Sequence, residues 1–336
     1  MSIEQASESK RSIKMAAVKI YCLALCLMST AVAANQLRVG FYAQTCPRAE
    51  TLVRQALNDA LRSDAGIGAD LLRMHFHDCF VRGCDGSILL DSVNGNSVEK
   101  NAGINQSIED EAFDVVDQAK VNVEAVCPGV VSCADILAFL ARDSVAHYGG
   151  WFYAVPAGRR DGRISISSES TSNLPTENFR LGQLVQNFKN KGLSPSEMVT
   201  LSGAHTIGVA HCVAFTRRLY NSSSSTGVDP TLDPTYAAQL RRSCPTLTTD
   251  EEVPMDPPSQ FGFDNSYYQG ILRNRGLFTS DQSLLTAPFS AAQVNLFARN
   301  SASFQSSFAA AMVKMGNIGV LTGFNGEIRK KCRVVN

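Results

Sequence analysis

Apolar residues recur along most of the chain at the three- and four-residue spacing of amphipathic helices. Two such stripes cover residues 49–61 and 181–188, and the second ends at the cationic turn Lys191-Gly192. Longer apolar stretches at residues 133–146 and 304–315 predict helices that are largely buried. This periodicity predicts a fold built mainly from helices.

Local signals add one helix start and two loops. Ser194-Pro195-Ser196-Glu197 is a capping box with proline at the first helical position, so we expect a helix to begin there and run towards His205. Alternation typical of a strand is confined to brief stretches such as residues 163–167. The serine-rich segments 164–173 and 221–226 predict loops, the first as a candidate domain junction.

The first 35 residues differ from the rest. Four basic residues flank an apolar run, residues 20–28, which gives way to the small residues 29–34. This order is typical of a secretory signal, and we predict cleavage near Gln36. A membrane anchor is the alternative, but the run is shorter than the roughly 20 apolar residues that span a bilayer. A more usual signal begins at Met15, so residues 1–14 are an upstream extension.

Charge and cysteine content then limit the classes of function. The chain has 31 basic and 31 acidic residues, which removes any electrostatic case for binding nucleic acid or anionic lipid. Eight of its 10 cysteines follow the signal. An even number in a secreted chain indicates four disulfides, whose connectivity the count alone leaves open. A zinc-thiolate site is the alternative, but no CxxC pair occurs.

The densest group of titratable residues is the segment Arg73–Cys79. In a strand, His75 and His77 would share a face and could bind zinc or copper. In a helix, Arg73 and His77 share a face instead, and the neighbouring apolar residues favour the helix. A cation beside an imidazole suits cleavage of a bond that develops negative charge, with His77 as acid/base. A surface arginine beside a packed histidine is the alternative.

Oxygen ligands follow at once in Asp78, Asp85 and Ser87, with glycines that permit tight turns between them. Carboxylate, hydroxyl and carbonyl oxygens are hard ligands that suit calcium, although the spacing is not that of an EF-hand. A solvated acidic turn is the alternative.

Long motifs carry a family resemblance over residues 36–336. LLRMHFHDCFVRGCDGS at residues 71–87 and LSGAHTIG at residues 201–208 resemble the secretory (class III) plant haem peroxidases. VSCAD at residues 131–135, GRRD at residues 158–161 and the ending CRVVN are similar to the same family.

The resemblance implies an all-α, two-domain fold with one haem b between a distal and a proximal domain. It implies a distal domain of about residues 36–175 plus 290–336 and a proximal domain of about residues 176–289. His205 would be the proximal iron ligand, His77 the distal acid/base and Arg73 the distal cation.

The resemblance also assigns supporting residues. Asp281 would accept a hydrogen bond from the proximal imidazole and strengthen its donation to iron. Asn105 would accept the other ring N–H of His77, and Glu99 would link that asparagine to a calcium region. Pro175 would lie at the substrate opening.

Two calcium ions and four disulfides are implied in the same way. The distal calcium would take Asp78, Val81, Gly83, Asp85 and Ser87. The proximal calcium would take Thr206, Asp256, Ser259, Gly262 and Asp264. The disulfides would be Cys46–Cys127, Cys79–Cys84, Cys133–Cys332 and Cys212–Cys244.

Several positions depart from the family pattern, so their contacts near the haem opening are not carried over from the family. They are Asp70, Ile104, Glu111, Ala112, Trp151, Tyr153 and Ala157. His75 is expected to pack as a structural residue, and His147 and His211 to be surface or haem-rim groups.

The resemblance implies a secreted, monomeric peroxidase of the cell wall or apoplast. It would use hydrogen peroxide to oxidise small phenolic or other aromatic donors in one-electron steps, with roles in wall cross-linking, lignin-type polymerisation and peroxide removal. The alternative is a calcium-binding, disulfide-linked wall protein without catalysis. Of two Asn-x-Ser acceptors, we expect glycosylation at Asn221 and none at Asn105.

Overall fold

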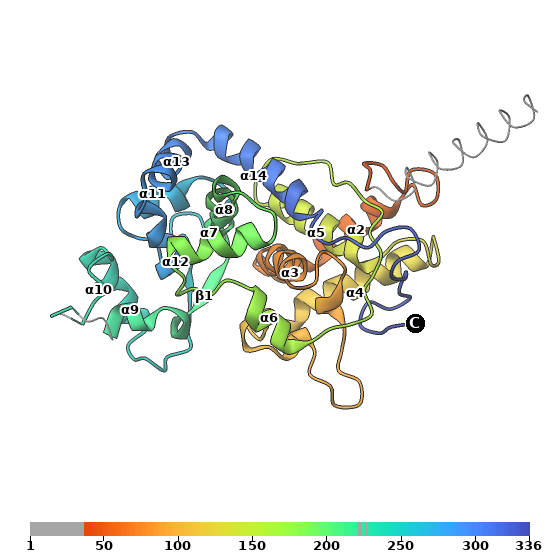
Figure 1. The fold of residues 1–336 in the computed structure, drawn as a ribbon, viewed down its shortest axis with the longest axis horizontal. Coiled ribbons are helices and arrows are strands. Elements are labelled where there is room, and N and C mark those ends of the chain that lie inside the picture. Colours follow the sequence, from red (N-terminus) through yellow and green to blue (C-terminus); the bar gives the residue numbers. More distant parts are fainter. Residues whose placement is uncertain (1–36, 221–223, 226) are drawn as a thin grey trace, which may run out of the picture.

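The computed structural model describes residues 37–336 except 221–223 and 226 (Figure 1). Within these residues the chain forms thirteen α-helices and a single two-stranded antiparallel sheet, β1 (Val209–His211) with β2 (Glu252–Pro254). The prediction of an all-α fold is confirmed. The predicted signal, its cleavage near Gln36 and the acceptor Asn221 lie outside the described residues. No helix of the described part is long and apolar enough to cross a membrane.

Four helices pack around the first half of the core. They are α2 (Ala49–Ala60), α3 (Ile67–Val81), α4 (Asp110–Glu124) and α5 (Cys133–His147). Helix α5 is buried on nearly all sides, because α2, α3 and α4 all contact it. The apolar stretch at residues 133–146 lacks a polar face for this reason. In Figure 1, α3 lies near the middle of the molecule, with α2, α4 and α5 on one side of it and α7 and α8 of the second half on the other.

The second half contributes the other large helices of the same core. They are α7 (Leu181–Asn190), α8 (Pro195–Ser202), α11 (Ser266–Leu272), α13 (Pro288–Arg299) and α14 (Ser301–Met315). The capping box that predicts α8 is present: Ser194 Oγ accepts from the Glu197 amide at 3.2 Å, and Glu197 accepts from the Ser194 amide at 2.6 Å. The helix ends at Ser202, and the 3₁₀ turn Gly203–Thr206 carries the chain on to His205.

A smaller apolar cluster lies at one end of the molecule. It joins the two-stranded sheet to α9 (Thr216–Tyr220) and α10 (Pro234–Ser243), with Leu219, Tyr236 and Leu240 buried inside it. The helix α12 (Thr279–Gln282) follows α11 in the chain, before α13. Figure 1 shows α9 and α10 at the end opposite α2 and α4.

Two local predictions from the sequence are wrong. Residues 163–167 do not form a strand, because the backbone bridges at Arg160 and Asp161 stop before them and Ile164 and Ile166 are exposed. The serine-rich segment 164–173 is not all loop, since its second part forms α6 (Ser167–Asn173). Contacts made in the fold override weak helix propensity here: Ser170 is fully buried, and α6 packs against α3.

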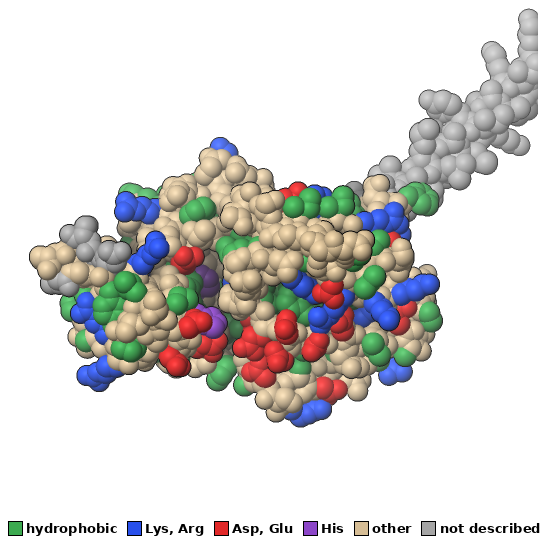
Figure 2. Space-filling view, turned by 90° about the horizontal axis from the view of Figure 1, so that it is seen from below, with side chains coloured by type: hydrophobic (Ala, Val, Ile, Leu, Met, Phe, Trp, Pro, Cys, Tyr) green, Lys and Arg blue, Asp and Glu red, His purple; other side chains and the backbone are tan. Residues whose placement is uncertain are grey.

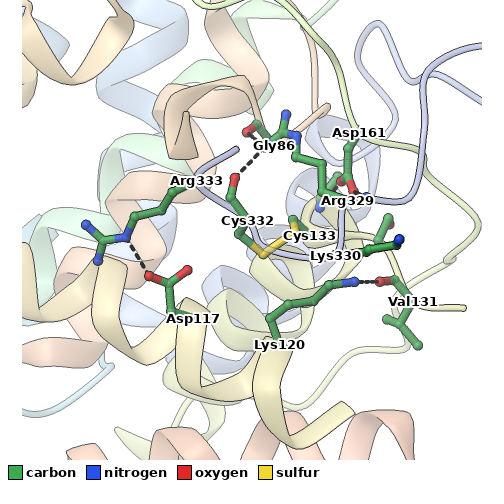
Figure 3. The surroundings of a disulfide bond; sticks show 12 residues. Gly86, Asp117, Lys120, Val131, Cys133, Asp161, Arg329, Lys330, Cys332 and Arg333 are labelled. Carbon is green, nitrogen blue, oxygen red and sulfur yellow. Dashed lines mark hydrogen bonds and ion pairs between the residues drawn. A yellow bond between two sulfur atoms is a disulfide. The ribbon is translucent and has the colours of Figure 1, made fainter. Parts of the chain in front are cut away.

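Four disulfides join the described cysteines, in the pairs that the family resemblance implies. They are Cys46–Cys127, Cys79–Cys84, Cys133–Cys332 and Cys212–Cys244. Figure 3 shows the surroundings of the bond between Cys133 and Cys332, which ties the carboxyl-terminal segment to α5. Beside it the buried Arg329 donates to the main-chain oxygens of Gly86 and Cys332, each at 2.8 Å. The last residues therefore brace the loop that follows α3.

Candidate active site

Helix α3 positions the first group of predicted site residues. Because the segment is helical, His75 and His77 point in different directions, so a two-histidine metal site on one strand face is wrong. His75 is 3% exposed, and its ring lies 3.8 Å from the Cys79 sulfur. Arg73 and His77 are one helical turn apart, and the charge of Arg73 acts on the His77 ring.

The orientation of His77 is set by Asn105. Oδ1 of Asn105 lies 2.5 Å from Nδ1 of His77, and both side chains are buried. The Asn105 amide nitrogen donates to the Glu99 carbonyl at 2.8 Å and to the Ser170 hydroxyl at 3.3 Å. With its nitrogen committed to donating, the amide presents its oxygen to the imidazole, which places the ring proton on Nδ1. Nε2 of His77 is left with a free lone pair.

Burial also keeps His77 neutral. Desolvation, and next the Arg73 guanidinium, lower the pKa of His77 to about 3, although the Asn105 hydrogen bond raises it. Arg73 itself donates to the carbonyl of Ile104 at 2.8 Å and to the hydroxyl of Ser107 at 2.9 Å. The arrangement is a neutral base beside a fixed cation, suited to accepting a proton where negative charge develops.

His205 forms a second histidine site, with a carboxylate partner. Its Nδ1 lies 2.7 Å from Oδ1 of Asp281, which is fully buried on α12. Burial raises the pKa of Asp281, but the charge of His205 and its hydrogen bond lower it below the ordinary value. The His205 side chain remains 38% exposed even though Nδ1 is engaged. A carboxylate that holds Nδ1–H leaves Nε2 as a basic ligand atom for a metal.

Tyr267 is a member of this second site that sequence reasoning missed. Its hydroxyl donates to the same Asp281 oxygen at 2.9 Å, and its ring meets the His205 ring edge to face, with centroids 6.0 Å apart. Phe278 also meets the imidazole edge to face, with ring centroids 5.5 Å apart. The pattern of apolar residues in α11 indicates only that Tyr267 lies on a buried face. No local sequence signal indicates that it contacts Asp281.

A hollow opens on the face drawn in Figure 2, with histidine and acidic side chains at its edges. Asp70 belongs to an acidic group: burial raises its pKa to about 7, Arg73 opposes that rise, and Glu109, Asp64 and Glu252 add to it. These carboxylates come from the loop before α3, the start of α4 and β2. Asp70 is thus one departure from the family pattern with a distinct electrostatic consequence.

Oxygen atoms without partners gather in the loop after α3. The Ser87 hydroxyl and both Glu99 carboxylate oxygens are buried without a hydrogen-bond partner among the described residues. Burial raises the pKa of Glu99 to about 8, although the nearby Ser87 hydroxyl opposes the rise. Burial and the neighbouring Asp85 carboxylate raise the pKa of Asp78. A bound cation would stabilise buried carboxylates with raised pKa and oxygens without partners, and these donors fit calcium.

Two predicted main-chain ligands lie at the start of this loop. The Val81 carbonyl already accepts a hydrogen bond from Lys191 Nζ at 3.3 Å. The backbone of Gly83 has a positive φ of +105°. A β-carbon on Gly83 would lie 2.6 Å from the Gly319 carbonyl oxygen, so glycine is required there.

The predicted proximal calcium ligands also lie together. The Thr206 hydroxyl is 3.2 Å from Asp256 and 3.4 Å from Asp264, and the Ser259 hydroxyl is 3.4 Å from Asp256. The Gly262 amide donates to Ser259 in the same turn. The fold adds Ser266, which contacts both carboxylates and which sequence reasoning missed. Within the described residues, no three His, Cys, Asp or Glu side chains lie close enough together to hold a metal ion by themselves, so any cation in either group needs hydroxyl and carbonyl ligands too.

The remaining predicted positions are exposed or partly exposed. His147 packs edge to face on Tyr148. His211 is paired with Asp250 at 3.0 Å and with Glu252 of the acidic group at 3.5 Å. Pro175 is partly exposed and lies two residues after the end of α6. Trp151 is half exposed, at 49%.

Comparison with known proteins decides the family. The family model described as Peroxidase matches residues 53–300. The chain is 55% identical to Peroxidase 5 of Vitis vinifera over 90% of this chain and 92% of that protein. It is 48% identical to Peroxidase 1 of Zea mays over 98% of this chain and 92% of the relative.

The chain belongs to the class III plant peroxidases. It is 47% identical to Peroxidase 3 of Arabidopsis thaliana, over 90% of this chain and 92% of that protein. As a member of this family it is an enzyme that uses hydrogen peroxide to oxidise donors, and the family implies a haem. The prediction of a peroxidase is confirmed.

Proposed function

We propose that this peroxidase binds one haem b between His205 and His77 and oxidises small phenolic donors by single electrons. The observation that supports the proposal is that the two imidazoles have different partners at Nδ1. Each Nδ1 is held by a buried side chain, an amide oxygen for His77 and a carboxylate for His205. An amide partner leaves a neutral base, whereas a carboxylate partner makes a stronger metal ligand.

These residues fit a haem. His205 has an available Nε2, a buried carboxylate behind it and two aromatic rings that hold its plane. The haem, when bound, supplies the electrons that cleave the oxygen–oxygen bond and takes electrons back from donors one at a time. The protein supplies the iron ligand, proton transfer and charge stabilisation.

Proton transfer in the proposed reaction belongs to His77. Its Nε2 accepts a proton from hydrogen peroxide and returns it to the departing oxygen, which leaves as water. Arg73 stabilises the negative charge that develops on that oxygen as the bond breaks. Asn105 keeps the Nδ1 proton in place, so that Nε2 can accept and donate.

Calcium and domain organisation complete the proposal. We assign one calcium to Asp78, Val81, Gly83, Asp85 and Ser87, with Glu99 next to it, and a second to Thr206, Asp256, Ser259, Gly262 and Asp264. The orphaned oxygens of Ser87 and Glu99 support the first, and the contacts among hydroxyls and carboxylates support the second. The distal domain comprises about residues 36–175 and 290–336, and the proximal domain about residues 176–289.

The cellular setting follows from the amino-terminal pattern and the disulfides. We infer a signal that is cleaved near Gln36 and a monomer that acts in the cell wall or apoplast. Four disulfides in the described chain support an oxidising compartment. Wall phenolics, in cross-linking and lignin-type polymerisation, are the proposed donors, and Pro175 is assigned to their point of entry.

Haem reconstitution tests the assignment of the iron ligand. We expect His205→Ala to lose stable haem binding, read from the visible spectrum and from haem content per protein, together with oxidation of a phenolic donor. His147→Ala, which changes an exposed histidine that packs on Tyr148, is the matched control and should keep both. Equal haem content and activity in His205→Ala would overturn the assignment.

A further inference from the structure

A surface cavity of about 200 Å³ lies outside the proposed haem site, between α10, the segment after β2, and α11 with the turn that follows it. Its apolar lining includes Met255, Tyr236 and Tyr267, and Arg273 and Arg275 lie at its rim. Pockets for drug-sized ligands have roughly 300–1,000 Å³, so this cavity suits a molecule with a single ring.

The rim offers positive charge. Arg273 is exposed and enters none of the ion pairs among the described residues. Arg275 is 3.7 Å from Asp233, at the outer limit of an ion pair, and its guanidinium lies 5.8 Å from the centre of the Tyr236 ring. The one carboxylate in the lining, Asp256, is buried and occupied by the hydroxyls of Thr206 and Ser266. Guanidinium groups recognise carboxylates through paired hydrogen bonds.

Tyr236 lines the cavity with atoms other than its hydroxyl. The residue is 3% exposed, and its hydroxyl is shielded from solvent and has no hydrogen-bond partner in the part of the chain that the structure describes. Burial, and then the charges of Asp256 and Asp281, raise its pKa, so the phenol stays neutral. A neutral aromatic side chain suits packing against an aromatic ligand.

The cavity also borders the proximal histidine site. Tyr267 lines it and donates to Asp281 Oδ1, the oxygen that His205 Nδ1 shares at 2.7 Å. A molecule packed against Tyr267 can therefore change the hydrogen bond from Tyr267 to Asp281. That change would alter the negative charge that Asp281 presents to His205 Nδ1.

We propose that this cavity binds a small aromatic carboxylate and couples it to the proximal imidazole through Tyr267 and Asp281. The carboxylate pairs with Arg273 and Arg275, and the ring packs on Met255 and Tyr236. The binding part stands on the cavity alone, whereas the coupling rests on the proposed role of His205.

Calorimetry with benzoate, which is not a peroxidase donor, tests the binding part. With calcium-saturated holoenzyme we expect saturable binding, at least tenfold weaker in Arg273→Gln/Arg275→Gln and unchanged in the control Arg242→Gln, an exposed arginine of α10. Both variants should keep the phenol-oxidising activity. Benzamide and inorganic phosphate, which lack the charge or the ring, should bind more weakly than benzoate. No benzoate binding, equal binding in the double arginine variant, or equally tight phosphate would overturn the site.

Redox titration tests the coupling separately. Benzoate should shift the midpoint potential of the holoenzyme, and Tyr267→Phe should abolish the shift while benzoate still binds. An unchanged potential in benzoate-saturated wild-type protein, or a shift that persists in Tyr267→Phe, would overturn the coupling. If the His205 assignment were wrong, His205→Ala would retain haem. The binding of benzoate measured by calorimetry would still stand in that case.

Discussion

At the residue scale, the two imidazoles of the proposed haem site differ in the group that holds Nδ1. Asn105 gives His77 a neutral partner, and burial lowers the pKa of His77 to about 3. Asp281 gives His205 an anionic partner whose own pKa is lowered by the histidine. The same side chain is thereby prepared for two tasks, proton transfer in one case and metal ligation in the other.

His77→Ala should keep haem but slow the reaction with hydrogen peroxide by about 10²–10⁴, the usual contribution of a general acid/base. Because the pKa of His77 is about 3, the wild-type rate should be independent of pH from about pH 5 upwards and should fall only as the pH approaches that value. Stopped-flow absorbance measures both effects. Unchanged rates in His77→Ala, or a wild-type rate that falls through pH 6–7, would contradict the assignment.

Asp70→Asn should change the pH dependence of stability. Burial raises the pKa of folded Asp70 to about 7, whereas an unfolded aspartate titrates near 4, so only the folded state holds a proton between these values. The contribution of Asp70 to stability is therefore present at pH 4 and is lost as the pH rises to 7. Urea unfolding should show similar stability for both proteins at pH 4 and a more stable variant at pH 8, by up to about 4 kcal/mol.

The exposed Asp59→Asn on α2 is the control for that comparison, because its side chain is 49% exposed. It should show no such divergence between pH 4 and pH 8. Parallel stability curves for Asp70→Asn and wild-type protein would mean that the Asp70 carboxyl is solvated.

At the element scale, the loop after α3 connects the distal histidine to the oxygen cluster. Asp78 directly follows His77, and its carboxylate accepts from the Gly86 amide at 2.9 Å. Arg329 holds Gly86 from the carboxyl-terminal segment. The position of the proposed base thus depends on how well this loop is held.

Chelation of calcium should lower activity before it lowers helix content. Without a cation the buried carboxylates repel one another and the loop loosens, which displaces His77 while the helices persist. Turnover of a phenolic donor and far-ultraviolet circular dichroism, followed during chelation with metal analysis, measure the two effects. Ser87→Ala should show the loss at lower chelator concentration. Full activity in calcium-free protein would rule out this coupling.

The 3₁₀ turn Gly103–Asn105 carries an acceptor sequence for glycan that its surroundings should block. Asn105 is 2% exposed, and both ends of its amide are hydrogen-bonded. We therefore expect glycopeptide mapping of the active protein to find Asn105 unmodified and a glycan at Asn221 in the serine-rich segment. A glycan on Asn105 of haem-loaded, active enzyme would show that this residue does not hold His77.

At the scale of the whole molecule, the bond between Cys133 and Cys332 joins residues 199 positions apart. Cross-links that close long loops restrict the unfolded chain most in the loop-entropy account, so Cys133→Ser/Cys332→Ser should lose about 2–5 kcal/mol of unfolding free energy. Replacing the pair Cys212–Cys244, only 32 positions apart, is the control and should cost less. Denaturant unfolding measures both, and a larger loss from the shorter loop would contradict the expectation.

Much of this architecture was predictable from the sequence. Periodicity alone predicts α2, α5, α7 and α14, because a helix with one buried face must repeat its apolar residues at that spacing. The capping box predicts the start of α8 to the residue, since its hydrogen bonds are local. The motifs around Arg73 and His205 indicate the family because they are long and ordered.

The tertiary structure alone decided the rest. Helix α6 forms from serine-rich sequence because its stability comes from contacts with α3, which are remote in the chain. Tyr267 and Ser266 reach their sites only when α11 packs beside the turn that bears His205, and no local pattern marks them. Burial likewise sets the charge state of His77 and Asp70, because desolvation depends on every segment that covers a group. Local hydrogen bonds and helix periodicity depend on residues that are close together in the sequence. Solvent exclusion and contacts between residues far apart in the sequence exist only in the folded chain.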